Sequence, residues 1–349
     1  MPVEIQTHPW YHRRHHRPQG GFTNIWDVPR DASFIKSARW LLARPFSQPG
    51  KANVPPPVHH LAADALREPP ETLRITWLGH AATLIQTPTH TLLTDPMLSR
   101  RASPVSFLGP AREAPLPLHA DDLPPVDIVL LSHDHYDHLD KRSIQTLQHD
   151  HQPLFLAPLG VGAILRGWGA TRVAEMDWWQ YADVDGLRYH ATPAMHFSGR
   201  GLTNRDGTLW CGWYVETAGD ADVPPWRLYY GGDSGYAGLF GDIRERLGAP
   251  NVALFPIGAY RPRWFMRPVH MDPEEAVQAF QDVGAEHFIP IHWGTFDLAD
   301  EPIQEPAERV RIRAHEQGLE EELHMLDIGT AFTLERTSVP APSPAGEAS

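Results

Sequence analysis

The sequence has little cysteine and a shortage of positive charge. One cysteine among 349 residues excludes an intramolecular disulfide framework and a cysteine-rich metal cage. With 30 Lys and Arg against 43 Asp and Glu, the formal net charge is −13. This charge argues against a general nucleic-acid-binding protein, because such proteins usually carry a basic face. Any metal site would have to use histidine and carboxylate ligands, and 21 histidines are available.

A long hydrophobic run and a secretion signal are also missing. No stretch approaches the ~18 apolar residues of a membrane span, and no apolar region follows the basic residues near the N-terminus. We therefore expect a cytoplasmic protein, and leave open a peripheral contact with the inner face of the membrane. The oligomeric state is equally open, with a homodimer as one option.

Composition divides the chain into three regions. Residues 1–71 read as a polar N-terminal arm and a proline-rich linker, in which residues 34–42 have the apolar spacing of a short helix. The arm contains His8, His12, His15 and His16, which we expect to be solvated. Residues 72–335 are expected to form one catalytic domain, and the low-complexity tail 336–349 is expected to be disordered.

Within residues 72–335, short strand patterns alternate with helical patterns. Strands are expected at 73–78, 82–87, 90–94, 127–131, 187–192, 227–231, 252–256 and 287–291. Helices are expected at 143–149 and 273–283, the second with Asp272 as its cap and Glu275 completing a capping box. This mixture predicts sheet layers covered by helices.

A dense group of metal-binding side chains follows the apolar run 127–131. The segment reads His133-x-His135-x-Asp137-His138, so four candidate ligands occupy six positions. In an extended segment, residues i and i+2 point the same way, so His133 and His135 can bind one ion. A turn then directs Asp137 and His138 toward a second ion. One ion could not readily use all four ligands from so short a segment, so the spacing predicts two metals.

Three later residues occupy equivalent places. His196, Asp233 and His292 each follow the C-terminal end of an expected strand, where α/β sheets usually place their ligands. Gly232 and Gly235 beside Asp233 allow a close approach of the backbone. Two divalent ions would leave the pocket positively charged, which suits an anionic group such as a phosphodiester.

Further polar residues have two interpretations each. His270 precedes the expected helix 273–283, so it could contact a phosphate or protonate a leaving alkoxide, or it could make a structural bond near the cap. Asp134 and Asp140 could orient ligand imidazoles or lie solvated in the loop. For His80 and Asp95, which end early strands, we favour a structural role over support of the site.

At these residues the sequence resembles the metallo-β-lactamase superfamily, whose mark is HxHxDH. More specific strings resemble the N-acyl-phosphatidylethanolamine-hydrolysing phospholipase D family within it. They include Trp77-Leu78-Gly79-His80-Ala81, Thr94-Asp95-Pro96, Asp177-Trp178-Trp179, Pro256-Ile257-Gly258-Ala259-Tyr260 and Ile291-His292-Trp293-Gly294-Thr295-Phe296. The resemblance covers roughly residues 72–330 and does not extend to the N-terminal arm or the tail.

The resemblance implies an αββα sandwich with two zinc ions between the sheets. Carried over residue by residue, it assigns His133, His135 and His196 to one zinc ion. It assigns Asp137, His138 and His292 to the other, with Asp233 as the bridge.

The resemblance also implies a phospholipase-D-type phosphodiesterase. Its substrate would be N-acyl-phosphatidylethanolamine or a related phospholipid, and its products phosphatidic acid and an N-acylethanolamine. Asp137, Asp233 and His270 are the residues that we expect to take part in this metal-dependent hydrolysis. The alternatives are a lactonase or ester hydrolase of a small soluble substrate, and a metal-binding protein without catalysis.

Overall fold

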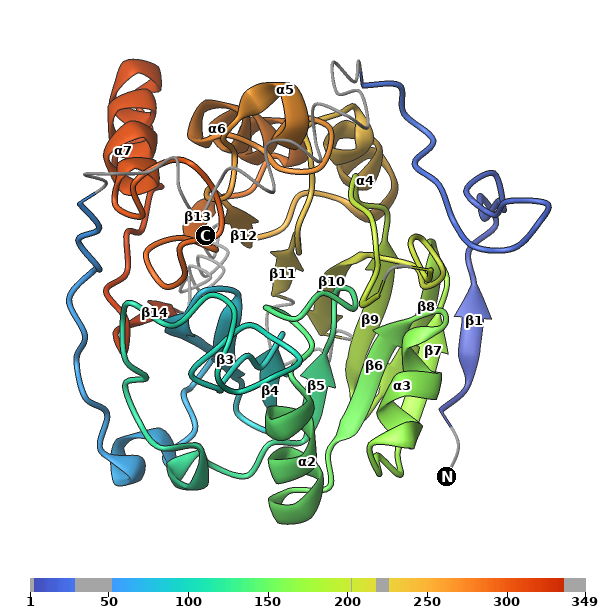
Figure 1. Ribbon diagram of the computed structural model, residues 1–349, viewed down its shortest axis with the longest axis horizontal. Coiled ribbons are helices and arrows are strands. Elements are labelled where there is room, and N and C mark those ends of the chain that lie inside the picture. The colour runs from blue at the N-terminus through green and yellow to red at the C-terminus, as the bar shows by residue number, and fades with distance from the viewer. Residues whose placement is uncertain (1–2, 29–51, 202, 218–225, 336–349) are drawn as a thin grey trace, which may run out of the picture.

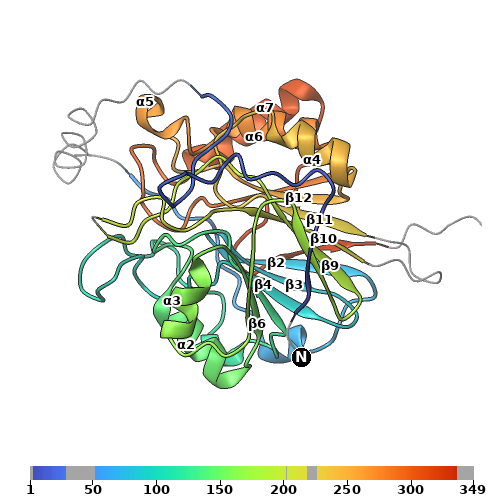
Figure 2. The ribbon, with the colours of Figure 1, turned by 90° about the vertical axis from the view of Figure 1, so that its right-hand side faces the viewer.

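The strands form two facing sheets, and helices cover the outer face of each sheet. The computed structural model describes residues 3–28, 52–201, 203–217 and 226–335. Among these residues each sheet has seven strands, and Figure 2 shows the sheets face to face with helices on either side. This is the αββα sandwich that the sequence resemblance predicts. No helix in the described part of the chain is long and apolar enough to cross a membrane.

The first sheet contains the strands of the later half of the chain and the N-terminal strand (Figure 1). In spatial order the strands are β1 (Ile5–Thr7), β8 (Gln180–Val184), β9 (Leu187–Thr192), β10 (Gly212–Thr217), β11 (Arg227–Tyr230), β12 (Val252–Pro256) and β13 (His287–Ile291). β11, β12 and β13 are parallel, whereas the pairs from β1 to β11 are antiparallel. The helices on this side are α4 (Leu239–Leu247), α5 (Arg263–Met266), α6 (Pro273–Val283) and α7 (Glu305–Gln317).

The second sheet is built mainly from the first half of the chain. In spatial order its strands are β14 (Ala331–Leu334), β2 (Leu73–Gly79), β3 (Ala82–Gln86), β4 (Thr91–Thr94), β5 (Ile128–Leu130), β6 (Leu154–Pro158) and β7 (Val173–Met176). The helices α2 (Lys141–Asp150) and α3 (Val161–Gly167) lie on its outer side. Two short 3-10 helices, η2 (Ala63–Leu66) and η3 (Ala120–Asp122), lie in the connections before β2 and before β5.

Large aromatic side chains fill the space between the sheets. Trp77, Trp213 and Tyr230 are completely buried there, and Trp213 Nε1 and Tyr230 OH donate hydrogen bonds to Leu131 and Asp95 of the second sheet's connections. A second apolar cluster lies between the second sheet and helices α2 and α3. Burial of apolar surface is worth roughly 25 cal/mol per Å², so these two layers supply the main stabilisation of the sandwich.

The predicted elements are present, with small shifts in their limits. Each predicted strand corresponds to a strand of the structure, and helix α6 has the predicted capping box of Asp272 and Glu275. Helix α2 begins earlier than predicted, because Asp140 accepts a hydrogen bond from the Ser143 amide at 3.0 Å and caps it there. The predicted helix at 34–42 and the predicted disordered tail at 336–349 lie outside the described residues. The limits of the catalytic domain stay a prediction.

The N-terminal arm packs on the first sheet, so its predicted solvation is wrong for the histidines in residues 3–28. β1 pairs with β8, and His15 is completely buried. The carboxylate of Asp177 accepts hydrogen bonds from His15 Nε2 at 2.5 Å, His16 Nε2 at 2.7 Å and Tyr11 OH at 2.7 Å. Only the folded chain brings these residues together, so composition alone misleads about the arm.

Replacing the carboxylate at this anchor should destabilise the protein. We expect Asp177→Asn to lower the free energy of unfolding by about 2 kcal/mol, because it weakens hydrogen bonds to a buried charged acceptor. Burial opposes ionisation of Asp177, but the bonds from His15 and Tyr11 outweigh it and lower the pKa. Because the pKa of Asp177 is lower in the folded than in the unfolded state, its carboxylate stabilises the folded protein at pH values above the unfolded-state pKa. This stabilisation is lost as the pH falls. The difference between wild type and variant should therefore shrink below pH about 4.

Denaturant unfolding at neutral and acid pH measures both effects. Asp183→Asn serves as the control, because Asp183 of β8 forms an exposed ion pair with Arg188 of β9 and such pairs are worth about 0–1 kcal/mol. An equal loss of stability in the two variants would contradict the role given to Asp177.

Candidate metal centre

Strand direction brings the candidate ligands to one edge of the sandwich. β2, β4 and β5 point the same way in the second sheet, because β3 lies antiparallel between β2 and β4. β9, β11 and β13 likewise share one direction in the first sheet. The residues that follow these strands are His80 after β2, Asp95 after β4, residues 133–138 after β5, His196 after β9, Asp233 after β11 and His292 after β13.

Three imidazoles form the first group. His133 Nε2 lies 2.8 Å from His135 Nδ1, and His196 Nε2 lies 3.1 Å from the same atom. His133 and His196 are buried, and His135 is half-buried. One nitrogen from each side chain lies within 4.8 Å of the others, so the three can hold a metal ion together.

The second group contains Asp137, His138 and His292. Asp137 Oδ2 lies 3.4 Å from His138 Nε2 and 3.5 Å from His292 Nε2. Asp233 lies between the two groups, with one oxygen 3.2 Å from His138 Nε2 and 3.8 Å from His196 Nε2. The structure thus brings together every residue predicted as a ligand, and His80 lies in the second group as a fourth side chain. The division of the ligands between two ions stays a prediction.

Hydrogen bonds with residues that surround the candidate ligands fix the orientation of these imidazoles. Asp95 Oδ2 lies 2.7 Å from His138 Nδ1 and accepts a hydrogen bond from Tyr230 OH at 2.5 Å. Ser132 Oγ lies 2.9 Å from His133 Nδ1. The carbonyl oxygen of Val269 lies 2.9 Å from His196 Nδ1. Such partners set which ring nitrogen faces a metal.

Two residues of the site were assigned mainly structural roles from the sequence. Asp95 holds His138, and His80 Nε2 lies 2.9 Å from Asp137 Oδ2. Both follow strands that run parallel to β5, and that shared direction is the signal that could have identified them. Asp134 instead accepts a hydrogen bond from the Gly199 amide at 2.8 Å, and Asp140 caps α2.

The backbone at the site turns sharply. His80, Asp95 and His292 have positive φ angles of 56°, 31° and 62°, a conformation that costs energy for residues other than glycine. At Gly232, with φ of 58°, a Cβ would come within 2.8 Å of Ser132 Cβ. The glycine predicted to permit a close approach therefore does so between β11 and the loop after β5.

Charge differs between the two groups. Burial lowers the pKa of His135 to about 3 and that of His196 to about 4, so both imidazoles are neutral at pH 7. Burial also opposes protonation of His292, but the carboxylates of Asp233 and Asp137 outweigh it and raise the pKa to about 9. Burial works against ionisation of Asp233, yet His138 and His292 hold its pKa well below the usual value.

The donor set fits divalent cations. Imidazole nitrogens and carboxylate oxygens converge within 4.8 Å of one another in each group. His270 Nδ1 is buried and has no hydrogen-bond partner among the described residues. It lies 3.9 Å from Asp233 Oδ2. A site made of imidazole and carboxylate groups is typical of zinc and of other first-row transition metals.

His270 lies beside the cluster, and a hydrogen bond to its backbone fixes its position. Its ring centre is 5.0 Å from that of His196. Arg263 Nη1 donates a hydrogen bond to the His270 carbonyl at 2.9 Å and forms an ion pair with Glu275 at 2.6 Å. These bonds connect His270 to α5 and to the first turn of α6.

Sequence comparison agrees with the geometry. Residues 90–293 match the family model described as the beta-lactamase superfamily domain. The chain belongs to the metallo-β-lactamase superfamily. An uncharacterised protein of Mycobacterium tuberculosis is 44% identical over 247 residues, which are 69% of this chain and 64% of that protein. The match therefore spans less than two thirds of this relative.

The match to a second relative, whose name states an activity, spans a larger share of that relative. The N-acyl-phosphatidylethanolamine-hydrolyzing phospholipase D 1 of Caenorhabditis elegans is 36% identical over 267 residues, which are 73% of each chain. Among solved structures, an isothiocyanate hydrolase from gut bacteria of Delia radicum has a TM-score of 0.60 at 20% identity. It covers 75% of this chain and 98% of its own, which supports the superfamily fold alone.

Asp95 gives a test of the support around the centre. We expect Asp95→Asn to weaken the binding of divalent metal by about 10- to 100-fold, because His138 loses its carboxylate partner. The measurement is the metal content of purified protein after equilibration with a chelator. Asp127→Asn is the control, because Asp127 is exposed just before β5 and its carboxylate accepts a hydrogen bond from the Thr91 amide, away from the candidate ligands. Equal metal content in the two variants would show that Asp95 does not support the centre.

Proposed function

We propose that this chain is a zinc-dependent phosphodiesterase of the phospholipase D type. Its substrate would be N-acyl-phosphatidylethanolamine or a related phospholipid, and its products phosphatidic acid and an N-acylethanolamine. The observation that supports the proposal is the cluster of candidate metal ligands in a chain that is 36% identical to the C. elegans phospholipase D over 73% of both chains.

We assign two zinc ions to the centre. His133, His135 and His196 would hold one, and Asp137, His138 and His292 the other. Asp233 would bridge them, since its carboxylate lies within 4 Å of nitrogens from both groups. When bound, the two ions would supply Lewis acidity, a water of lowered pKa and compensation for charge on the phosphoryl group.

The charges of the proposed ligands favour the binding of an anionic group. Neutral imidazoles in the first group add no negative charge, and the carboxylates of Asp137 and Asp233 are the only two among the proposed ligands. The assigned zinc ions would therefore leave the pocket positive, and a phosphodiester would be attracted to it.

We further propose that His270 contacts the substrate. It lies next to the bridging carboxylate and contributes a buried ring nitrogen without a partner among the described residues. In the proposed reaction, water supplies the new P–O bond and the P–O bond to the N-acylethanolamine breaks. Burial lowers the pKa of His270 well below its ordinary value, so its neutral ring would contact the phosphoryl group through a hydrogen bond. The departing alkoxide would take the proton that the attacking water releases.

A product assay tests the reaction. We expect purified protein incubated with N-acyl-phosphatidylethanolamine to release phosphatidic acid and the N-acylethanolamine in equal amounts. Phosphatidylcholine and a panel of lactones should be run in parallel. His135→Ala and Asp233→Asn should abolish turnover, because each removes a proposed ligand. Opening of lactones without release of phosphatidic acid would support the small-substrate hydrolase instead.

A separate test concerns His270. We expect His270→Asn to lower kcat by about 100-fold, the range for loss of one group that stabilises charge in the transition state, with two zinc ions still bound per chain. Zinc content separates this result from simple loss of the centre. An unchanged kcat with full zinc content would remove His270 from the reaction.

A further inference from the structure

A cavity with several cationic side chains opens beside the metal centre. Its volume is about 640 Å³, and Tyr136, which lies between the ligands His135 and Asp137, forms part of its wall. We call its cationic side chains the basic cleft. They are Arg100, Arg101, Lys141, Arg142 and Arg200. They come from the segment after β4, from the first turn of α2 and from the loop that contains His196.

Three cations of the basic cleft are free of ion pairs. Arg100, Lys141 and Arg142 are exposed, and the structure shows no hydrogen bond or ion pair from their side chains to any described residue. Asp140 also borders the cavity, but its carboxylate is engaged by Ser143 and Ser99. The cleft is therefore a local positive region on a chain whose net charge is −13.

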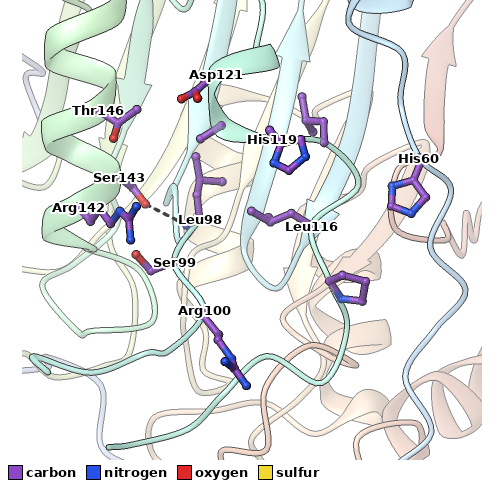
Figure 3. Close-up of a pocket in the computed structure, with 13 residues that line it drawn as sticks. His60, Leu98, Ser99, Arg100, Leu116, His119, Asp121, Arg142, Ser143 and Thr146 are labelled. Carbon is purple, nitrogen blue, oxygen red and sulfur yellow. Dashed lines mark hydrogen bonds between the residues drawn. The ribbon is translucent and has the colours of Figure 1, made fainter. Parts of the chain in front are cut away.

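A second cavity adjoins the first, and both arginines that line it also line the first. Its volume is about 560 Å³, and the two cavities share Ser99, Arg100 and Arg142. Figure 3 shows Arg142 on α2 and Arg100 on the neighbouring segment, with Ser99 between them. His60 and His119 lie on the opposite side of this view. Asp121 supplies the single carboxylate among its lining residues.

An exposed apolar loop borders the basic cleft. We call residues 103–108 the apolar loop, and its first four residues line the 640 Å³ cavity. Phe107 is 79% exposed, Leu108 66% and Val105 37%. Only two other large apolar side chains in the described part of the chain are comparably exposed, Val54 and Ile312. Solvation of three such side chains in one loop is unfavourable and marks a contact site.

The base of the apolar loop is fixed. Arg101 and Ala111 form an isolated β-bridge. The Ala102 amide donates a hydrogen bond to the Pro110 carbonyl at 3.0 Å, and Arg101 Nη1 donates one to the Gly109 carbonyl at 2.6 Å. These bonds hold the two ends of the apolar loop together beside the cations of the basic cleft.

We propose that the basic cleft and the apolar loop together dock on a lipid bilayer that contains anionic phospholipids. Cations attract the phosphate groups of such a surface, and exposed aromatic and aliphatic side chains enter its interfacial region. Both features contribute, because the average surface of this acidic protein is repelled by an anionic bilayer. Docking does not require hydrolysis. It would bring Tyr136 and the neighbouring centre to the membrane.

Vesicle sedimentation tests the docking surface with the full chain. We expect binding to mixed phosphatidylcholine and phosphatidylglycerol vesicles, weak binding to phosphatidylcholine alone, and a decrease as salt is raised. The triple variant Arg100→Gln, Lys141→Gln, Arg142→Gln should bind mixed vesicles about tenfold more weakly or worse. Phe107→Ser with Leu108→Ser should also weaken binding, with the remaining binding more sensitive to salt.

Matched variants make the result specific. Arg14→Gln, Arg172→Gln and Arg311→Gln change the net charge equally at exposed positions outside the cleft, and Ile312→Ser removes an exposed apolar side chain from α7. These controls should bind like wild type. Failure of wild type to bind mixed vesicles, or an equal loss in the control variants, would overturn the proposal, as would equally tight binding of a single-stranded oligonucleotide at the cleft.

The triple variant of the basic cleft and the double variant of the apolar loop also distinguish this proposal from the proposed function. Turnover of detergent-dispersed phospholipid should remain at the wild-type level in them, because none of the changed residues lies among the proposed ligands. Loss of vesicle binding with intact turnover supports docking. Vesicle binding without any turnover would leave docking intact and contradict the proposed reaction instead.

Discussion

The imidazoles and carboxylates of the centre meet because six strands in two sheets end at one edge. β2, β4 and β5 of one sheet and β9, β11 and β13 of the other deliver their following loops to the same place. Between the sheets, the buried aromatic layer fixes their separation, and with it the distance between ligands that come from different sheets. A shift in either sheet would separate Asp233 and His292 from the ligands after β5.

Buried carboxylates with several donors recur in this molecule. Asp95 accepts from Tyr230 and from the amide of Ser132, and it orients His138. Asp177 accepts from two imidazoles and a tyrosine of the N-terminal arm. A buried carboxylate is costly to desolvate unless donors surround it, so each of these two residues specifies one arrangement of its partners. One arrangement serves the centre, and the other attaches the arm to the first sheet.

The local part of this architecture could be predicted from the sequence. The spacing of His133, His135, Asp137 and His138 needs only an extended segment and a turn. His196, Asp233 and His292 are identified by the strands that precede them. The supporting role of Asp95 was harder to see, because its partner His138 lies in another strand connection. The packing of the arm on Asp177 and the grouping of Arg100 with Arg142 and Arg200 depend on contacts between distant segments, which periodicity and composition do not encode.

One contact of the arm extends to the centre itself. Asn24 Nδ2 donates a hydrogen bond to the His196 carbonyl at 2.9 Å, and Asn24 Oδ1 accepts one from Trp210 Nε1 at 3.1 Å. Asn24 therefore gains these two partners only after residues 196 and 210 have been synthesised. The last candidate ligand, His292, emerges later still. The full set of candidate ligands therefore exists only after His292 has been synthesised, long after the HxHxDH segment itself.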